Sequence, residues 1–266
     1  MIFKGGTSLS KGFRLIRRMS EDVDVLLLGE GFSNTGRDQA LQALTDKVAA
    51  HLGVTASQAR VERGRKMVTR FSYSDRPMLV GSAGVLLELG FRGHPEPSRS
   101  VSMTSYLADY IATREDKETI IYEELDPIQL DLLAPERTLL EKIFALHVAA
   151  TNFEANPEEL SRLARYYYDI RMLLDNDDVC SSLSLLGDMQ AYSETELLSS
   201  GIGGPFVGPA RPNGGYAQSP AFRASPDMLA ELEPAYDASM AFLFLNEPKP
   251  ALVDCLSAVQ GKAELL

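Results

Sequence analysis

Two short stretches near the N-terminus decide the fold: Lys4-Gly5-Gly6-Thr7-Ser8-Leu9 and, further along, Ser20-Glu21-Asp22-Val23-Asp24-Val25. The sequence predicts a helix over residues 7–17, although Gly12 weakens it, and a strand over residues 22–28. A double glycine lets the backbone come close to a phosphate, and the amides at the start of the following helix point to the same place. Thr7 and Ser8 add hydroxyl donors or cap this helix. We therefore expect a phosphate-binding segment made by Gly5, Gly6, Thr7 and Ser8.

Asp22 and Asp24 place two carboxylates on one strand. Because side chains alternate along a strand, both point to the same face and can share divalent cations. Magnesium prefers oxygen ligands and keeps substrate phosphates in its shell, and two ions about 3.5–4 Å apart can stabilise the attacking and leaving oxygens of a phosphoryl transfer. Such a cluster usually needs a third carboxylate from a neighbouring strand. Glu88 is the candidate, because it interrupts an apolar run, where an ionised acid is costly unless it is paired or bound to metal.

Each of these motifs also has an ordinary interpretation. An Asp-x-Asp sequence is often just the exposed face of an edge strand, and a Gly-Gly pair is often just a turn. The ordered combination of a double glycine, a helix and then Asp-x-Asp on a strand is considerably more specific than either part.

The rest of the chain predicts further strands first and helices afterwards. We expect strands over residues 68–73 and 85–91, a loop over residues 93–100, a long Gly/Pro/Ser-rich loop over residues 201–226, and helices over residues 36–51, 135–150, 158–175, 227–245 and 248–261. Turns are expected at residues 75–77 and 81–84. The result is an α+β protein: a small mixed sheet with helices, then a mostly helical half, with the division near residue 130.

Composition narrows the class of protein. Hydrophobic residues make up 45% of the chain and charged residues 24%, as in ordinary globular proteins. The net charge of −11 argues against a protein that coats nucleic acid, yet basic residues gather in residues 1–18 and 60–70. These clusters either guide one RNA end into a site or are simply solvated. Two distant cysteines, no signal peptide and only short apolar runs lead us to expect a cytoplasmic protein.

The ordered pair of motifs is the signature of the polymerase-β-like nucleotidyltransferase superfamily. More narrowly, residues 3–11 together with residues 18–24 resemble the AbiEii-type toxins of abortive-infection and toxin–antitoxin systems, a family that includes the mycobacterial MenT-type toxins. Later segments are similar to the same family: Pro135-Glu136-Arg137-Thr138-Leu139-Leu140-Glu141-Lys142, Arg165-Tyr166-Tyr167-Tyr168-Asp169, Gly214-Gly215-Tyr216-Ala217 with Ser219-Pro220-Ala221-Phe222, and the pattern from Tyr236 to Met240 with Phe242 and Phe244. The resemblance covers most of the chain, and least of all residues 30–80.

This resemblance implies a bilobal enzyme, with a nucleotidyltransferase core over residues 1–130 and a helical domain over residues 131–266. It implies magnesium at Asp22 and Asp24, a triphosphate contact from Lys142, and Asp169 lining the same cleft. It also implies a nucleoside triphosphate substrate, an RNA acceptor such as the 3′ end of transfer RNA, and a cognate antitoxin. In this family a helical segment usually precedes the double glycine, so we expect either an upstream start or the loss of that segment.

Lys142 and Asp169 have ordinary interpretations of their own. Lys142 lies at the edge of the apolar stripe of its helix, where a lysine usually reaches solvent. Asp169 lies opposite the apolar stripe of its helix and near Arg165, where a surface ion pair is usual. With the resemblance, we interpret both as catalytic residues.

Three other functions stay open. The same fold can modify a small-molecule or protein hydroxyl, or it can be a catalytically inactive module that binds its antitoxin. A nucleotide-sugar glycosyltransferase also uses Asp-x-Asp, but it places the motif after a nucleotide-binding subdomain, whereas only residues 1–21 precede Asp22 here.

Overall fold

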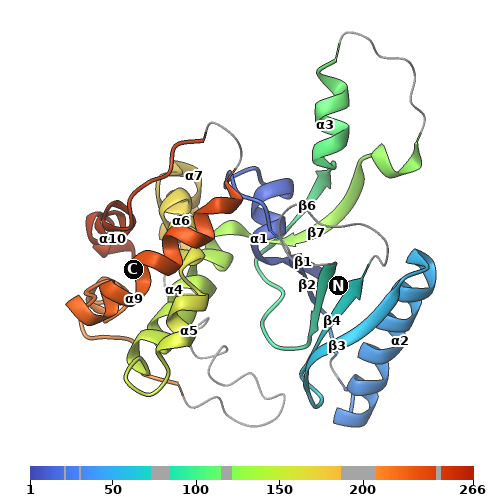
Figure 1. Ribbon diagram of the computed structural model, residues 1–266, viewed down its shortest axis with the longest axis horizontal. Coiled ribbons are helices and arrows are strands. Elements are labelled where there is room, and N and C mark those ends of the chain that lie inside the picture. Colours follow the sequence, from blue (N-terminus) through green and yellow to red (C-terminus); the bar gives the residue numbers. More distant parts are fainter. Residues whose placement is uncertain (21, 30, 73–83, 115–121, 187–207, 244–246) are drawn as a thin grey trace. The chain divides into compact units, whose positions relative to one another are not determined.

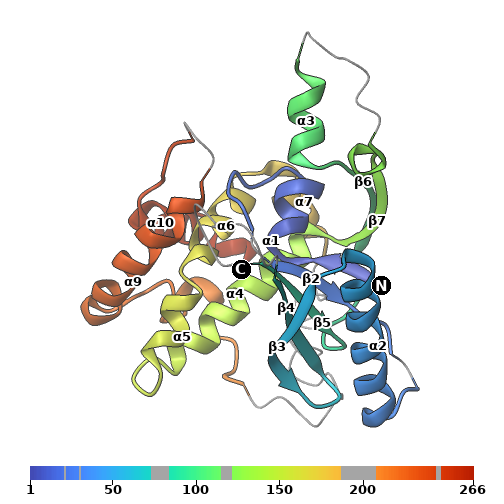
Figure 2. The same ribbon diagram turned by 45° about the vertical axis from the view of Figure 1, so that its right-hand side comes forward.

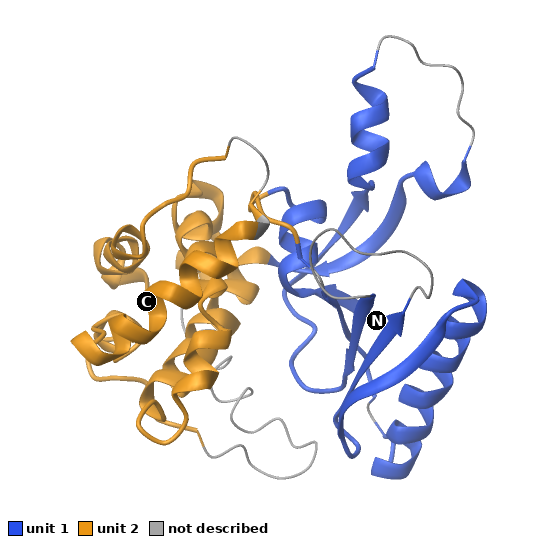
Figure 3. Cartoon of the chain, viewed as in Figure 1, with its two compact units in different colours: residues 1–14, 20–134, 201–203 blue, residues 15–19, 135–200, 204–266 orange. Residues whose placement is uncertain are grey.

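The computed structural model describes residues 1–266 except for residues 21, 30, 73–83, 115–121, 187–207 and 244–246. The chain divides into two compact units (Figure 3). The first comprises residues 1–14, 20–134 and 201–203, and the second comprises residues 15–19, 135–200 and 204–266. The segment Leu15–Met19 thus belongs to the second unit, although the residues on both sides of it belong to the first.

The first unit is built on one mixed sheet (Figure 1). Among the described residues its strand order is β3-β4-β5-β2-β1-β7-β6. The strands are β1 (Ile2–Lys4), β2 (Asp22–Leu26), β3 (Thr55–Glu62), β4 (Lys66–Ser72), β5 (Val85–Gly90), β6 (Ser98–Met103) and β7 (Ile128–Leu133). The pairs β2–β5 and β1–β7 are parallel, and the other neighbouring pairs are antiparallel. The mixed sheet agrees with the predicted α+β class.

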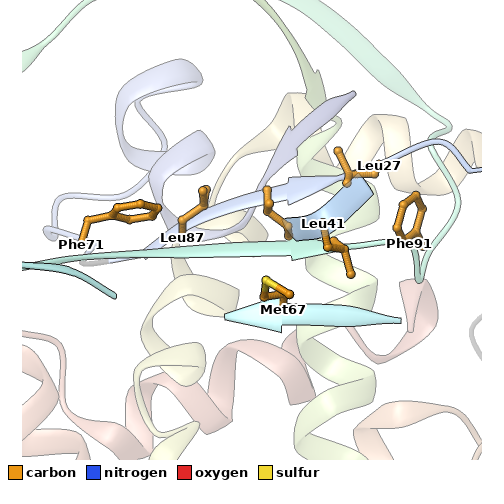
Figure 4. Packing of buried hydrophobic residues seen from close by; sticks show 7 residues of the cluster. Leu27, Leu41, Met67, Phe71, Leu87 and Phe91 are labelled. Carbon is orange, nitrogen blue, oxygen red and sulfur yellow. The ribbon is translucent and has the colours of Figure 1, made fainter. Parts of the chain in front are cut away.

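Helix α2 (Asn34–Leu52) covers one face of this sheet. The side chain of Ser33 caps the helix by accepting a hydrogen bond from Gly36 N–H, and Gly53 ends it in the left-handed conformation. In β4, buried residues alternate with half-buried ones, as expected for a strand with one covered face. The core on that face is formed by Leu27, Leu41, Met67, Phe71, Leu87, Leu89 and Phe91 (Figure 4). The opposite face carries a smaller buried cluster of Ile2, Leu26 and Leu133.

The helix predicted over residues 7–17 is shorter than expected. It consists of α1 (Gly5–Thr7) and the π-helical turn η1 (Ser8–Gly12). A Cβ atom at Gly12 would lie 2.2 Å from Leu132 Cδ1, so the chain here packs closely on a side chain of β7. Arg14 then adopts a positive φ of 57°, which cannot continue a helix. The strand predicted over residues 22–28 also ends early, at Leu26.

Several elements of the first unit were not predicted. These are β1, β3, β6, β7, α3 (Tyr106–Ala112) and the 3₁₀ turn η2 (Glu123–Leu125). Nearly every residue of β3 is exposed, so this edge strand lacks the alternation by which strands are recognised. The loop predicted over residues 93–100 is wrong from Ser98 onward, where β6 begins with a polar sequence. Figures 1 and 2 show α3 beyond the ends of β6 and β7.

The second unit is helical in its described residues. Its helices are α4 (Pro135–Thr151), α5 (Pro157–Arg162), α6 (Arg165–Leu174), α7 (Asp177–Leu186), α9 (Pro226–Ser239) and α10 (Leu252–Gly261), with 3₁₀ turns η3 (Tyr216–Gln218), η4 (Met240–Phe242) and η5 (Ala263–Leu265). The predicted apolar stripe of α4 is confirmed, since all of its members are buried: Leu139, Leu140, Ile143, Phe144 and Leu146. The single helix predicted over residues 158–175 is wrong, because Leu163 and Ala164 separate α5 from α6.

The closing part of the chain follows its prediction in outline. The helix predicted over residues 227–245 ends earlier, at Ser239, and continues only as η4. Helix α10 forms within the predicted residues 248–261. The predicted loop over residues 201–226 contains η3, and its residues 201–207 lie outside the described residues, as do the turn at residues 75–77 and most of the turn at residues 81–84. Across the described chain, no helix has both the length and the apolar character needed to cross a membrane.

Candidate active site

The two aspartates of β2 lie on the sheet face opposite α2. Asp24 pairs with Lys4 of β1 on one side and with Glu88 of β5 on the other. Directly paired residues of neighbouring strands point to the same face, so Asp24 and Glu88 are neighbours on that face. Asp22 lies two residues before Asp24 and therefore shares the face as well. The expectation that Glu88 comes from a strand next to the aspartates is confirmed.

The double-glycine segment packs directly against this pair. Gly5 has a φ of +78°, and a Cβ atom built on it would lie 1.9 Å from Asp24 Oδ2. Only glycine can therefore stand beside this carboxylate. The Thr7 hydroxyl donates to the carbonyl oxygen of Asp22 at 2.5 Å, and the Ser8 hydroxyl donates to the carbonyl oxygen of Gly5 at 2.9 Å. The Thr7 hydroxyl thus links the two motifs, and the Ser8 hydroxyl braces the turn of the double-glycine segment itself.

Glu88 is engaged by a lysine of the adjoining strand. Lys66 Nζ lies 2.6 Å from Glu88 Oε2, and both side chains are about a quarter to a third exposed, at 26% and 33%. Within the described residues, no group of three or more His, Cys, Asp or Glu side chains converges on one point. Asp22 and Asp24 supply the oxygen ligands that magnesium prefers, and one or two carboxylates suffice when substrate phosphates complete the shell. The aspartate pair fits such an ion, whereas Oε2 of Glu88 is paired with Lys66.

The second unit contains a buried cluster of charges. Arg18 donates from Nε to Asp169 Oδ1 at 2.7 Å and from Nη2 to Asp169 Oδ2 at 2.6 Å. Lys142 Nζ lies 2.9 Å from the same Oδ2, and its ammonium stands 3.8 Å from the ring centroid of Tyr166. Relative exposure is 2% for Arg18, 0% for Asp169 and 5% for Lys142. The surface interpretations are therefore wrong for both Lys142 and Asp169.

Burial and charge act in opposite directions on Asp169. Burial alone would raise the pKa of this carboxyl, but the charges and hydrogen bonds of Arg18 and Lys142 lower the pKa to about 2. Asp169 is consequently ionised at neutral pH. One carboxylate then neutralises only one of the two cations that it contacts, so these three residues carry a net positive charge.

Arg18 is a site residue that the sequence analysis missed. Its Nη1 also donates to the carbonyl oxygen of Met19 at 2.9 Å, and the backbone N–H of Arg17 donates to the Tyr168 hydroxyl at 3.0 Å. The Arg17–Tyr168 bond and the Arg18–Asp169 pair fix the segment Leu15–Met19 on α6. That segment leads directly into the strand that carries Asp22. In the sequence the region was marked by the lack of acids among residues 1–18 and by the family resemblance of residues 18–24, but neither signal assigned a role to Arg18.

The late loop is held on α4 by a buried histidine. His147 Nδ1 lies 2.9 Å from Ser219 Oγ, and His147 Nε2 lies 3.0 Å from the carbonyl oxygen of Ala210. Tyr167 donates from its hydroxyl to the carbonyl oxygen of Ala221 at 2.9 Å. These contacts give the described part of the loop a structural role in the second unit.

Comparison with known proteins identifies the family. Residues 1–258 match the family model described as "Nucleotidyl transferase AbiEii toxin, Type IV TA system". The chain belongs to the AbiEii nucleotidyltransferase toxin family. The AbiEii assignment makes it a nucleotidyltransferase of a toxin–antitoxin system, which confirms the resemblance drawn from the motifs. AbiEii membership implies a nucleoside triphosphate substrate, a divalent metal and an antitoxin.

Among solved structures, this AbiEii chain is similar to MenT4, a nucleotidyltransferase toxin from Mycobacterium tuberculosis H37Rv. The two share 18% sequence identity with a TM-score of 0.48, and the match covers 99% of this chain and 82% of MenT4. No curated protein matches the chain.

Proposed function

We propose that the protein transfers a nucleoside monophosphate from a nucleoside triphosphate to the 3′ end of a transfer RNA, with magnesium as the cofactor. One observation carries the proposal: Gly5 lies against Asp24 so closely that no side chain fits between them. A phosphate held over this backbone would therefore stand beside the carboxylates.

In this proposal Asp22 and Asp24 hold magnesium, with Glu88 as the third ligand. When bound, magnesium would offset the negative charge that gathers on the reacting phosphate oxygens. Thr7 keeps Asp22 in register through its bond to the Asp22 carbonyl group, and Lys66 holds Glu88 while the site is empty of substrate. Fixing these groups before the substrate arrives lowers the cost of organising them during the reaction.

Gly5, Gly6, Thr7 and Ser8 form the proposed cradle of the triphosphate. Because Gly5 and Gly6 have no side chains, phosphate oxygens could approach the backbone of this segment more closely than that of other residues. The family resemblance assigns a triphosphate contact to Lys142 as well, and we retain it as a proposal. Asp169 would then act as a positioning residue, because it orients the ammonium of Lys142.

The acceptor and the partner follow from the family. A protein with a net charge of −11 meets RNA only through local basic groups, so its binding of transfer RNA should be weak at high salt. A cognate antitoxin is the expected protein partner. Because triphosphates and transfer RNA occur together in the cytoplasm, we propose that compartment.

The test is to incubate the purified protein with total transfer RNA, magnesium and each α-labelled triphosphate in turn, with Asp22→Ala as the control. Label in RNA with the wild type alone supports the proposal and names the nucleotide. Label in protein or in a small molecule points to another hydroxyl acceptor. If nothing is labelled while an antitoxin still binds, the chain is an inactive binding module.

A further inference from the structure

The sheet face that carries the aspartates continues across β5 and β4 to β3. Asp22 pairs with Leu86, and Leu86 pairs in turn with Arg70. Asp24 pairs with Glu88, and the same row continues through Val68 to Arg60. Because paired residues point to one face, Arg70 and Arg60 share the face of the carboxylates. Arg70 is two strands from Asp22, a backbone separation of about 10 Å.

This register divides the basic cluster of residues 60–70 into two groups. Arg60, Lys66 and Arg70 point to the carboxylate face, whereas Arg63 stands at the turn between β3 and β4. The Arg63 side chain is 83% exposed, and its Nε lies 3.7 Å from Asp38 Oδ2. A contact with a substrate near the carboxylates is therefore open to the first group and not to Arg63.

Arg70 differs from its two basic neighbours on the face. Lys66 is paired with Glu88 at 2.6 Å, and Arg60 Nη2 is paired with Glu62 Oε1 at 2.6 Å. Arg70 Nη1 is shielded from solvent and has no hydrogen-bond partner in the part of the chain that the structure describes. Arg70 as a residue is only half-buried, so part of its side chain reaches solvent, and a phosphate matches the fork of donors of a guanidinium. Arg70 thus has an unused capacity to bind an anion.

The order of the strands indicates where that anion comes from. The double-glycine segment follows β1, which lies on one side of β2, whereas β5 and β4 lie on the other side. In a phosphoryl transfer the attacking and leaving oxygens are roughly in line. A triphosphate cradled by Gly5 and Gly6 would release pyrophosphate on the β1 side. The attacking hydroxyl would then arrive from the side of β5 and β4.

We propose that Arg70 binds a backbone phosphate of the acceptor RNA, whose 3′ end crosses β4 and β5 to reach the carboxylates. Arg60 adds positive charge at the outer edge of the same path. The contact reads no base, because it is made to phosphate alone. This inference rests on the proposed function for the nature of the acceptor. The alternative ligand of Arg70 is a phosphate of the triphosphate itself. The two possibilities differ in which KM, that for RNA or that for the triphosphate, depends on Arg70.

The test compares Arg70→Gln and Arg70→Lys with Arg63→Gln, which removes the same charge from the same hairpin. Binding of full-length protein to transfer RNA is measured by fluorescence anisotropy without triphosphate, over a series of salt concentrations. We expect Arg70→Gln to weaken binding about ten-fold and to reduce the slope of log affinity against log salt by about 0.7–0.9, the loss of one phosphate contact. Arg70→Lys should restore part of the affinity, and Arg63→Gln should change it less than two-fold.

Kinetics of nucleotide transfer then separate the two phosphate sources. The inference predicts that Arg70→Gln raises KM for transfer RNA and leaves KM for the triphosphate unchanged. A raised KM for the triphosphate with unaltered RNA binding would overturn the assignment to the acceptor. Equal effects of Arg70→Gln and Arg63→Gln, or no RNA binding by the wild type at low salt, would overturn the inference altogether. If RNA binding depends on Arg70 but no nucleotide is transferred, the inference stands and the proposed reaction fails.

Discussion

The guanidinium of Arg18 donates two hydrogen bonds to the carboxylate of Asp169, from Nε to Oδ1 at 2.7 Å and from Nη2 to Oδ2 at 2.6 Å. The two residues are 151 positions apart in the chain, and neither is exposed by more than 2%. The bond ties the segment that precedes the Asp22 strand to helix α6. The conformation of that segment therefore depends on an ion pair that the solvent cannot replace.

Replacing Asp169 with Asn should strongly destabilise the protein. The substitution keeps the shape of the side chain but leaves the charges of Arg18 and Lys142 buried without a counterion, a loss of about 3–5 kcal/mol in the free energy of unfolding. Urea denaturation measures it. The matched control is Asp175→Asn at the end of the same helix, where a half-exposed pair with Arg171 should contribute at most about 1 kcal/mol. Equal effects of the two variants would show that burial of the cluster is unimportant.

Acid should remove the contribution of the Asp169 carboxylate to the stability of the protein. The folded-state pKa of Asp169 is about 2, below the value of about 3.9 expected for an unfolded aspartate. The stabilisation is therefore complete above the unfolded value and is lost as the pH falls through the folded value, by about 3 kcal/mol in total. Urea denaturation between pH 5 and pH 2 should show the wild type losing this stability relative to Asp169→Asn. Parallel curves for the two proteins would contradict the assigned pKa.

Protonation of His147 should lower the stability of the protein at a milder pH, between pH 8 and pH 5. Burial lowers the pKa of this imidazole, although the bond to the Ala210 carbonyl group opposes the shift. Below the unfolded value of about 6.5 the unfolded chain binds a proton more readily than the folded one, so the stability decreases as the pH is lowered. His147→Gln should flatten that dependence between pH 8 and pH 5, and replacement of the exposed His51 should not. Urea denaturation over this range would contradict the role of His147 if both variants kept the slope.

The residues of the site that could be predicted from the sequence are those that occur in short local motifs. Gly5 and Asp24 stand out because each occurs in a short motif with a specific backbone requirement. Glu88 could be assigned to a neighbouring strand because it is a charged residue in an apolar run, where an ionised acid is costly unless it is paired or bound to metal. Whether it binds metal stays a prediction.

The buried cluster could not be predicted in this way. Taken alone, the amphipathic pattern of its helix assigns Asp169 to a polar surface, and only the family resemblance favoured a position in the cleft. That rule fails where a distant cation such as Arg18 neutralises the charge, and a separation of 151 residues hides such a partner. Strands such as β3 and β6 were missed for a related reason, since exposed polar strands carry no alternation of apolar residues.

Gly5→Ala should disable the site without unfolding the protein. The added methyl group would occupy the position of Asp24 Oδ2, and displacing a catalytic group by about 1 Å can lower the rate on the order of 100-fold. The control is Gly53→Ala, which has a similar φ of +63° but nothing within 4 Å of the new Cβ. It should cost about 1–2 kcal/mol in stability and leave transfer unchanged. Similar rates for Gly5→Ala and the wild type would show that the carboxylate tolerates displacement.

The most direct test of the central claim is the magnesium-dependent transfer of α-labelled nucleotide to transfer RNA by Asp24→Asn and by Asp131→Asn. Both variants replace an aspartate of the same sheet, but Asp131 is exposed on β7, away from the paired row of Asp24 and Glu88. The account predicts that Asp24→Asn folds normally and transfers no detectable label, while Asp131→Asn transfers label as the wild type does. Undiminished transfer by Asp24→Asn would show that the reaction takes place elsewhere.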